Sequence, residues 1–474
     1  MTKNNIPYLL PALAFLSGAA LAQWEPDRRL SVADTFNTWL VYNNSNRIAA
    51  DGENLHVTWY DERDEGNGRG AEIYYLRSTD AGTTWSADTR LTNAPGWSIH
   101  PAVATDRANV HVAWMDLRAN SEVYFLRSTD AGVTWQPESR LTNTPELSQV
   151  PAIASRDGYV HLVWDEYVSN FEIDYRRSTD DGATWQTTVP LTNDPGLSRF
   201  PSVGATGPYV HVAWFDDRDG NYNVYYKRST DYGATWQDDF RATADPDTQW
   251  YAHVSASGSD VYLAWSDKRG AAADLYLRRS TDNGATWLAE TALSTAYRNQ
   301  ADPCIVADGA NVHIVWTDDR DNWPNFEIYY KRSTDRGATW LQDERLTIDD
   351  AFSTGASVAA SGDAVYVVWR DCRDTNYGDV FYKRNPTGNV GISERSTLFA
   401  SRLTPSATLI HGTLNLLPGI CNQKSALVLY DLTGRPVMSL HSGRNDLHHL
   451  APGVYFYRFE SPSGSAGAQI TIVH

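Results

Sequence analysis

The sequence contains few cysteines and few methionines, and it carries no excess of positive charge. Only 3 Cys and 3 Met occur in 474 residues. Cys304, Cys372 and Cys421 are too few and too scattered for a disulfide framework, so packing must stabilise the fold. Asp and Glu outnumber Lys and Arg by 58 to 40, which gives a formal net charge of −18. This surplus disfavours nucleic acid and anionic lipid as partners.

A long apolar run is present only at the N-terminus. Residues 1–22 place Lys3 ahead of an apolar run and end in Ala20-Leu21-Ala22, the small-x-small pattern of a signal-peptidase site. No later stretch reaches the roughly 18 uncharged apolar residues that a membrane helix needs. We therefore expect a signal peptide at residues 1–22, a secreted protein and no membrane span.

A repeat of about 50 residues fills most of the chain. A period of this length is typical of stacked or circular architectures. In each unit, short alternating apolar stretches are separated by turn residues, which predicts four antiparallel strands. The second strand occurs seven times, as LHVTW, VHVAW, VHLVW, VHVAW, VYLAW, VHIVW and VYVVW. We predict an all-β fold, a seven-bladed β-propeller with four-stranded antiparallel blades over residues 23–384.

The seventh unit lacks a fourth strand, because its sequence leaves the repeat after FYKRNPTG at residues 381–388. Near the mature N-terminus, RRLS at residues 28–31 matches the RLT that ends other units. We expect residues 28–31 to complete the seventh blade and close the ring, because closure removes an exposed sheet edge.

Six copies of the pattern STDxGxTW lie between the third and fourth strands of units one to six. Asp and Ser can hydrogen-bond their own turn, Gly permits a positive φ, and Trp packs between strands. A catalytic group is needed once, whereas a turn clamp is needed in every blade. We therefore interpret as structural the six aspartates Asp80, Asp130, Asp180, Asp231, Asp282 and Asp335.

This pattern resembles the Asp-box, or BNR repeat, of the sialidase-like superfamily. In that superfamily the boxes lie on the face away from the active site. The loops between the second and third strands open on the other face, and they carry a second repeat, Asp-x-Arg. Its arginines are Arg63, Arg118, Arg218, Arg269, Arg320 and Arg373. They are either ligand-binding groups or hairpin clamps that pair with the acid at the start of the third strand, such as Glu72.

The resemblance also implies a sialidase-like site, with three converging arginines, an acidic Asp and a Tyr activated by a Glu. Arginine suits this task because its planar fork grips a carboxylate at two points. Arg47-Ile48-Ala49 followed by LHVTWYDER resembles the N-terminal strands of sialidases, although those have six blades. Unit three breaks the Asp-x-Arg repeat. The catalytic candidates are Arg47, Asp61, Arg63, Glu166 and Tyr167.

Large flat side chains in the loops of the same face suit stacking against sugar rings. These aromatic candidates are Trp97, Trp250, Tyr251 and Trp323. We predict that the protein binds an extracellular glycan or polymer on its loop face, and a sialidase-like exo-glycosidase or a protein-interaction scaffold are the alternatives. The strand histidines recur in separate blades and cannot converge on one ion, so we expect no metal and no cofactor.

The repeat stops after residue 384, and residues 385–400 read as a polar linker. Residues 401–474 alternate again, which predicts a small immunoglobulin-like β-sandwich. The segments LYDLTGRPV and LAPGVYFYRF resemble the C-terminal sorting domain of proteins exported by the type IX system. The resemblance implies recognition by the outer-membrane secretion machinery. A plain accessory module, and attachment to the cell surface after export, are the open alternatives.

Overall fold

The computed structural model describes residues 24–31, 38–39, 46–63, 70–270, 272–294, 298–322, 325–374 and 378–387, together with short segments between residues 408 and 473. The chain divides into two compact units, Met1–Gly391 and Ile392–His474. No helix among these residues is long and apolar enough to cross a membrane. The expected signal peptide and most of the expected linker lie outside the described residues.

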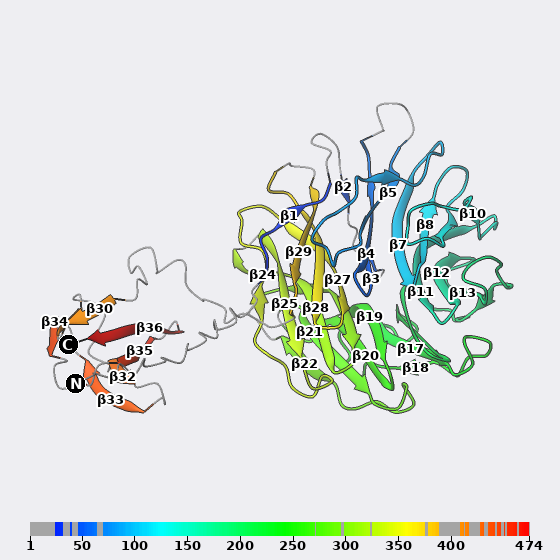
Figure 1. The fold of residues 1–474 in the computed structure, drawn as a ribbon. Helices are drawn as coiled ribbons and strands as arrows, with labels where there is room; N and C mark the ends of the chain where they lie inside the picture. The colour runs from blue at the N-terminus through cyan, green and yellow to red at the C-terminus, as the bar shows by residue number, and fades with distance from the viewer. Residues whose placement is uncertain are drawn as a thin grey trace, which may run out of the picture. The chain divides into compact units, whose positions relative to one another are not determined.

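Within the described part of the first unit, the strands form seven antiparallel sheets arranged around a centre (Figure 1). Blades one and two contain β2 (Thr38–Trp39), β3 (Ile48–Asp51), β4 (Asn54–Asp61), β5 (Glu72–Ser78) and β6 (Thr89–Arg90), then β7 (Ser98–Asp106), β8 (Asn109–Asp116), β9 (Glu122–Ser128) and β10 (Ser139–Arg140). Blades three and four contain β11 (Leu147–Arg156), β12 (Tyr159–Tyr167), β13 (Phe171–Ser178) and β14 (Val189–Pro190), then β15 (Ser198–Thr206), β16 (Tyr209–Asp216), β17 (Asn223–Ser229) and β18 (Phe240–Arg241).

Blades five and six contain β19 (Gln249–Ser257), β20 (Asp260–Asp267), β21 (Asp274–Ser280) and β22 (Thr291–Ser294), then β23 (Gln300–Asp308), β24 (Asn311–Asn322), β25 (Asn325–Ser333) and β26 (Glu344–Arg345). Blade seven contains β27 (Ser353–Ser361), β28 (Ala364–Asp371), β29 (Asp379–Asn385) and β1 (Arg28–Arg29). The first strands of neighbouring blades contact one another around the ring. The protein is therefore a seven-bladed propeller with four-stranded antiparallel blades.

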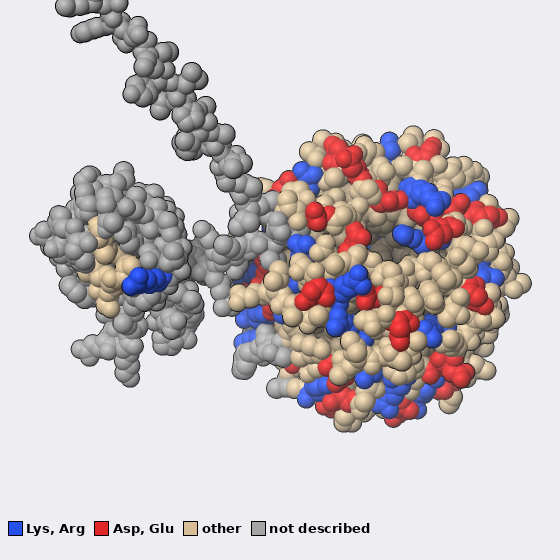
Figure 2. All heavy atoms as spheres, turned by 60° about the horizontal axis from the view of Figure 1, so that its bottom comes forward, with Lys and Arg blue, Asp and Glu red and all other residues tan. Residues whose placement is uncertain are grey.

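The second strand of each blade is apolar on both faces because a blade is sandwiched between two others. In β8, the seven residues after Asn109 are all buried. Trp114 is fully buried, stacks on Tyr124 at 5.9 Å between ring centroids, and donates from Nε1 to Asp116 Oδ2 at 3.0 Å. On the face shown in Figure 2, acidic and basic side chains are interspersed and the surface is hollowed near the middle of the ring.

The Asp-box turns tie each blade to its neighbour. In blade one, Ser78 Oγ accepts a hydrogen bond from the Gly82 amide at 2.9 Å, and Asp80 Oδ1 accepts one from the Thr84 amide at 2.8 Å. Hydrogen bonds from Thr84 lower the pKa of Asp80 to about 2. Gly82 has a φ of 80°, and a side chain there would collide with the hydroxyl of Tyr382 in blade seven. The same hydrogen bonds recur in the other five copies, which fits a structural role for these aspartates.

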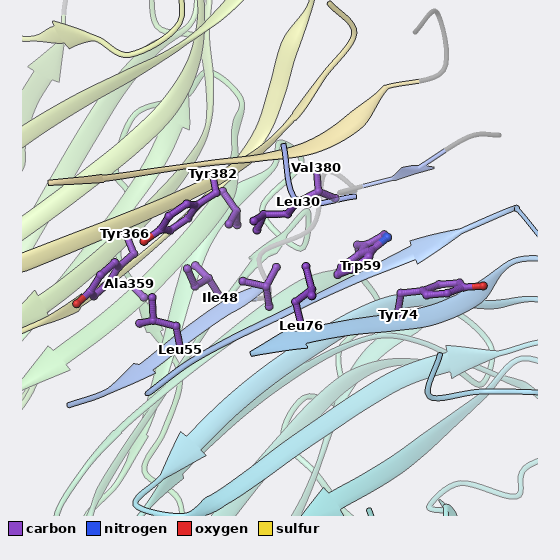
Figure 3. Packing of buried hydrophobic residues seen from close by; sticks show 12 residues of the cluster. Leu30, Ile48, Leu55, Trp59, Tyr74, Leu76, Ala359, Tyr366, Val380 and Tyr382 are labelled. Atoms are coloured by element: carbon purple, nitrogen blue, oxygen red, sulfur yellow. The ribbon is translucent and has the colours of Figure 1, made fainter. Parts of the chain in front are cut away.

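The ring closes between its first and last blades. β1 pairs antiparallel with β29, so the N-terminal segment supplies the outer strand that the seventh unit lacks. Leu30, which is 6% exposed, lies between Ile48 and Trp59 of blade one and Tyr382 of blade seven (Figure 3). The neighbouring Ser31 Oγ donates to a carboxylate oxygen of β29 at 2.7 Å. An apolar contact and the pairing of β1 with β29 thus join the first and last blades, which are far apart in sequence.

The innermost strands present an edge whose amide groups have no partner within their own sheet. Side chains of the preceding blade accept several of these hydrogen bonds. Ser202 Oγ accepts from the Val254 amide at 3.1 Å, and Ser255 Oγ accepts from the Ala307 amide at 3.0 Å. Because a buried amide without a partner costs free energy, these contacts help to hold the blades together.

The second unit contains two sheets among its described strands. One has the order β30-β36-β35-β32-β33 and the other pairs β31 with β34. The strands are β30 (Thr408–His411), β31 (Thr413–Leu416), β32 (Leu427–Tyr430), β33 (Pro436–Leu440), β34 (Gly443–Asp446), β35 (Gly453–Ser461) and β36 (Gly464–Val473). The immunoglobulin-like sandwich and the sorting role stay predictions.

Ring closure predicts the effect of Leu30→Ala. Removing this buried side chain leaves a cavity between blades one and seven, and we expect a loss of about 2 to 4 kcal/mol in the free energy of unfolding. Urea denaturation followed by tryptophan fluorescence measures it. Ile348→Ala, at a position that is 77% exposed, is the matched control and should change stability by less than about 0.5 kcal/mol. Equal effects of the two substitutions would contradict a closure role for Leu30.

Candidate functional site

A bulge recurs at the same place in the innermost strand of blades two to seven. The pairing with the second strand shifts there, for example between Ile99 and Ala102 in blade two. One residue in each bulge has a positive φ, between 50° and 63°. These residues are His100, Val150, Phe200, Tyr251, Asp302 and Gly355. A β-branched residue such as Val150 rarely adopts this conformation, so the ring architecture imposes it.

We call these six residues the bulge ring. They lie toward the face that carries the loops between second and third strands, because each bulge is next to the last residues of a second strand. In blade one, β2 and β3 both pair with β4 and together take the place of the first strand. The backbone position is thus shared, whereas the side chains differ from blade to blade. Such variation on a constant scaffold is typical of a binding site.

Ionisable groups meet on one side of the bulge ring. Arg47 precedes β3, is 3% exposed, and attracts Asp302 and Tyr60. Burial lowers the pKa of Arg47 to about 10. Burial raises the pKa of the Asp302 carboxyl to about 7, although the positive charge of Arg47 opposes the shift. The Asp302 carboxyl therefore changes its protonation near neutral pH.

Tyr60 and His100 complete this ionisable half. Their rings lie 6.3 Å apart. Burial lowers the pKa of His100 to about 4, with a further contribution from Arg47, so this imidazole is neutral at pH 7. Burial and the nearby carboxylate of Glu62 raise the pKa of the Tyr60 hydroxyl. Among the described residues, Asp302 Oδ1 and His100 Nδ1 are buried and have no hydrogen-bond partner.

Aromatic rings occupy the side contributed by blades four and five. Phe200 stacks on Phe215 at 5.4 Å and meets Tyr251 edge-on at 6.5 Å. Trp250 lies 6.4 Å from Tyr251. The guanidinium of Arg199 lies 4.8 Å from the Phe200 ring centroid. The bulge ring therefore combines an apolar, aromatic half with an ionisable half.

Asp165, in the unit that breaks the Asp-x-Arg repeat, holds the aromatic half in place. Its Oδ2 is 3.1 Å from Arg199 Nε, and its Oδ1 accepts the Phe200 amide at 2.8 Å. Burial raises the pKa of Asp165 to about 7 against the attraction of Arg199. This carboxyl thus fixes the backbone of a bulge directly.

The predicted arginines of the Asp-x-Arg repeat are bound within their own blades. Arg218 contacts Asp216 at 2.5 Å and Asp239, just before the fourth strand, at 2.8 Å, and its guanidinium lies 4.4 Å from the Tyr225 ring centroid. Equivalent contacts are made by Arg63, Arg118, Arg269, Arg320 and Arg373. These contacts favour the hairpin-clamp interpretation over ligand binding.

The partners of the clamp differ from the expected ones. The acid that begins the third strand was the expected partner, but it binds the fourth strand instead. Glu122 Oε1 lies 2.6 Å from Arg140, and Glu122 Oε2 accepts from Thr142 Oγ1 at 2.5 Å. The arginine instead binds the aspartate two residues before it. The tryptophan of the second strand holds that aspartate in place by donating a hydrogen bond to its carboxylate.

The structure does not bring Glu166 and Tyr167 together. Glu166 takes the place of the repeat aspartate and accepts from Trp164 Nε1 at 2.9 Å and from Ser148 Oγ at 2.6 Å. Tyr167 points to the opposite face of the strand, is 36% exposed and meets Phe171 edge-on at 5.1 Å. Asp61 likewise belongs to a clamp, as it binds Arg63.

Of the aromatic candidates, Trp250 and Tyr251 lie at the bulge ring. Trp97 is 40% exposed, next to Gly70 in the loop of blade one. Trp323 lies outside the described residues.

Among the described residues, no group of three or more His, Cys, Asp or Glu side chains is arranged to hold a metal ion. Sequence reasoning missed Tyr60, Glu62, Phe200 and Asp302 as site residues. The sequence marks four of the six bulge positions only by a varied residue before proline, as in HPAV, VPAI, FPSV and DPCI.

Comparison with known proteins agrees with this architecture. Residues 108–314 match a family model described as a BNR repeat-like domain. No curated protein matches the chain in sequence.

Solved structures with a similar fold include three carbohydrate-related proteins. The BP39L lectin from Burkholderia pseudomallei has a TM-score of 0.54 at 11% identity, covering 73% of this chain and 98% of the lectin. An ulvan lyase of polysaccharide lyase family PL25 has a TM-score of 0.52 at 14% identity, covering 74% and 95%. The Hadza microbial sialidase Hz136 has a TM-score of 0.46 at 16% identity, covering 68% and 78%. At these identities the likeness to the lectin and to the lyase shows the fold alone.

Blade three lacks the Asp-x-Arg clamp, and from this difference we predict that the stability of the protein depends on pH. Val168 replaces the arginine, and Asp174 replaces the aromatic ring beneath it. Burial, with the charges of Glu166 and Glu172, raises the pKa of Asp174 to about 7. The folded chain then retains a proton that the unfolded chain releases above pH 4, so stability falls as pH rises from about 4 to 7.

Asp174→Asn removes this penalty. We expect the variant to be more stable than the parent by about 1 to 2 kcal/mol at pH 8 and nearly equal to it at pH 4. Thermal unfolding at both pH values measures the difference. Asp157→Asn, at a side chain that is 48% exposed, is the control and should show no such pH dependence. A gain that is the same at both pH values would contradict the assignment.

Proposed function

We propose that the protein binds an extracellular glycan containing an acidic sugar at the bulge ring. The observation that carries this proposal is the buried Arg47 beside Asp302, whose carboxyl pKa lies near 7, next to an aromatic half. The guanidinium fork of arginine suits a carboxylate. A neighbouring sugar ring can then lie against the aromatic rings, as in other sites that combine apolar walls with a few polar groups.

Two further features support a sugar ligand. Asp302 Oδ1 and His100 Nδ1 have no hydrogen-bond partner among the described residues, and buried polar atoms of this kind are usually paired. Sugar hydroxyls supply both donors and acceptors. In addition, the structures of similar fold include a lectin and a polysaccharide lyase, so this architecture accommodates glycans.

This proposal predicts that Arg47 determines binding of acidic sugars. We expect Arg47→Met to weaken binding of an acidic oligosaccharide by at least about tenfold and to leave the weaker binding of its neutral counterpart unchanged. Isothermal titration against a panel of acidic and neutral oligosaccharides measures both. Arg107→Met, at a side chain that is 75% exposed, is the control. Because Arg47 is buried, the thermal midpoint of each variant is recorded first.

The same measurement has a pH dependence. Above pH 7 the ionised Asp302 competes with the ligand carboxylate for Arg47, so we expect tighter binding at pH 5.5 than at pH 8.5. Asp302→Asn should flatten this dependence. If every acidic oligosaccharide binds no better than its neutral counterpart at both pH values, the proposal is wrong.

A sialidase-like exo-glycosidase is the second candidate, and one arrangement favours it. Tyr60 and Glu62 are two residues apart, are both buried and interact, and Arg47 attracts both Tyr60 and Asp302. In such a reaction the protonated Asp302 donates its proton to the leaving oxygen. The Tyr60 oxygen attacks the anomeric carbon as Glu62 accepts its proton, and water then releases the sugar.

Hydrolysis predicts release of a chromogenic aglycone from an acidic glycoside. We expect Tyr60→Phe and Glu62→Gln each to lower the rate by at least about a hundredfold while oligosaccharide binding is retained. Colorimetric release at pH 5 to 8 is the measurement. Arg218→Met, in a clamp, serves as a variant that alters stability without removing a group of the site. Binding without any release would leave the protein as a lectin.

The proposed location follows from the termini of the sequence. We place the protein outside the cytoplasm, with residues 1–22 as the signal peptide and residues 401–474 as a module recognised by the type IX secretion machinery. An extracellular glycan is the ligand class that such a location offers.

A further inference from the structure

Arg199 is bound differently from the six arginines of the Asp-x-Arg repeat. It lies in β15, directly before the bulge of blade four. A clamp arginine such as Arg218 contacts the carboxylates of Asp216 and Asp239. Arg199 has one acidic partner among the described residues, Asp165, to which its Nε donates at 3.1 Å. Its two terminal nitrogens make no hydrogen bond to a described residue, so the outer edge of the guanidinium keeps its donors for a ligand.

Aromatic rings on both sides hold this guanidinium in place. Its central carbon lies 3.9 Å from the ring centroid of Phe171 and 4.8 Å from that of Phe200. Phe171 in turn meets the exposed Tyr167 edge-on at 5.1 Å. The side chain of Arg199 is 25% exposed. A guanidinium that is packed between two rings and still reached by solvent can bind an anion without first being ordered.

The break in the Asp-x-Arg repeat at blade three accounts for this arrangement. Val168 stands where the other blades have the clamp arginine, and it is 63% exposed. Asp165 stands directly after the strand tryptophan, where the other six units have Tyr, Met, Phe, Ser, Thr or Arg. This carboxylate also accepts the amide of Phe200, the residue after Arg199. The irregular residues of one blade thus orient a single arginine of the next.

We propose that Arg199 is a second anion-binding residue of the bulge ring, and that the glycan carries at least two anionic groups, one bound by Arg47 and another by Arg199. This inference rests on the proposed glycan binding and narrows the ligand class. Arg47 precedes β3 of blade one and attracts Asp302 of blade six, whereas Arg199 belongs to blade four. The two arginines therefore bind separate groups of one ligand.

The second anionic group is a carboxylate or a sulfate ester, because each offers two oxygens to the paired N–H groups of a guanidinium. The protein as a whole repels such a ligand, since its formal net charge is −18. A preference for two anionic groups over one must then come from local cations such as Arg199. A general attraction between opposite net charges does not explain it.

Matched ligands test the number of anionic groups. The first probes are tetrasaccharides of galacturonate, glucuronate or mannuronate in which all carboxylates but one are methyl esters. The second probes have two free carboxylates, and the third have one free carboxylate and one sulfate ester. Isothermal titration at fixed pH and salt gives each Kd. We expect a dianionic probe to bind at least about tenfold tighter than its monoanionic counterpart, and the tighter of the two distinguishes carboxylate from sulfate.

The outcomes separate this inference from the proposed function. If the monoanionic probes bind through Arg47 and no dianionic probe binds more tightly, the inference about Arg199 is wrong and the proposed function stands. If no acidic probe binds better than a fully esterified one, both are wrong.

Substitutions of Arg199 test the residue itself. We expect Arg199→Met to remove the preference for the dianionic probe, an effect of at least about tenfold, and to leave the affinity for the monoanionic probe unchanged. Arg199→Lys keeps a charge beside Asp165 but loses the fork, and it should lower the preference by about threefold or more. This variant decides the question if Arg199→Met does not fold.

Arg107→Met is the matched control, because it removes the same charge from a side chain that is 75% exposed, in the turn between β7 and β8. It should leave the preference unchanged. A preference that persists in Arg199→Met and Arg199→Lys would overturn the proposal. So would an equal loss of affinity for monoanionic and dianionic probes, which would show that Arg199 only positions Phe200.

Discussion

The structure depends on closure of the ring between blade one and blade seven. A single blade buries neither of its two apolar faces alone, so each strand tryptophan is covered only when a neighbour is present on both sides. Closure requires β1 to pair with β29 and Leu30 to enter the core that both blades share. The same junction places Arg47, whose amide is held by Ser357 of blade seven. The charge at the centre of the proposed site is thus set by the contact that completes the fold.

Residues that recur in the repeat and residues that vary have separate tasks. The recurring residues lie at equivalent places in the blades. Side chains of the Asp-box, the strand tryptophans and the Asp-x-Arg clamps all make contacts within a blade or between neighbouring blades. Varied side chains appear where the innermost strand bulges, and there His100, Phe200 and Asp302 differ in chemistry while sharing one backbone conformation. A ring in which the backbone repeats and the side chains differ can recognise an asymmetric ligand.

Much of the fold could be predicted from the sequence, because it rests on local patterns. The seven copies of the second strand predict seven blades, and the missing fourth strand of the last unit indicates where the chain must be completed. The bulge ring could not be predicted in this way, because a bulge is a property of pairing between strands. The clamp partners were also beyond sequence reasoning: Arg218 had several acids in reach along the chain, and only folding shows that Asp216 and Asp239 converge on it.

The electrostatics of the ring centre follow from a small number of charges in a buried place. Arg47 lies where its charge acts on Asp302, on His100 and on Cys304 together. Asp302 and Cys304 are two residues apart in β23, so one strand of blade six carries both groups that respond to this charge. A ligand carboxylate bound to Arg47 would weaken its hold on each of them. Protonation of Asp302 would therefore respond to a ligand bound at the proposed site, through the arginine that ring closure positions.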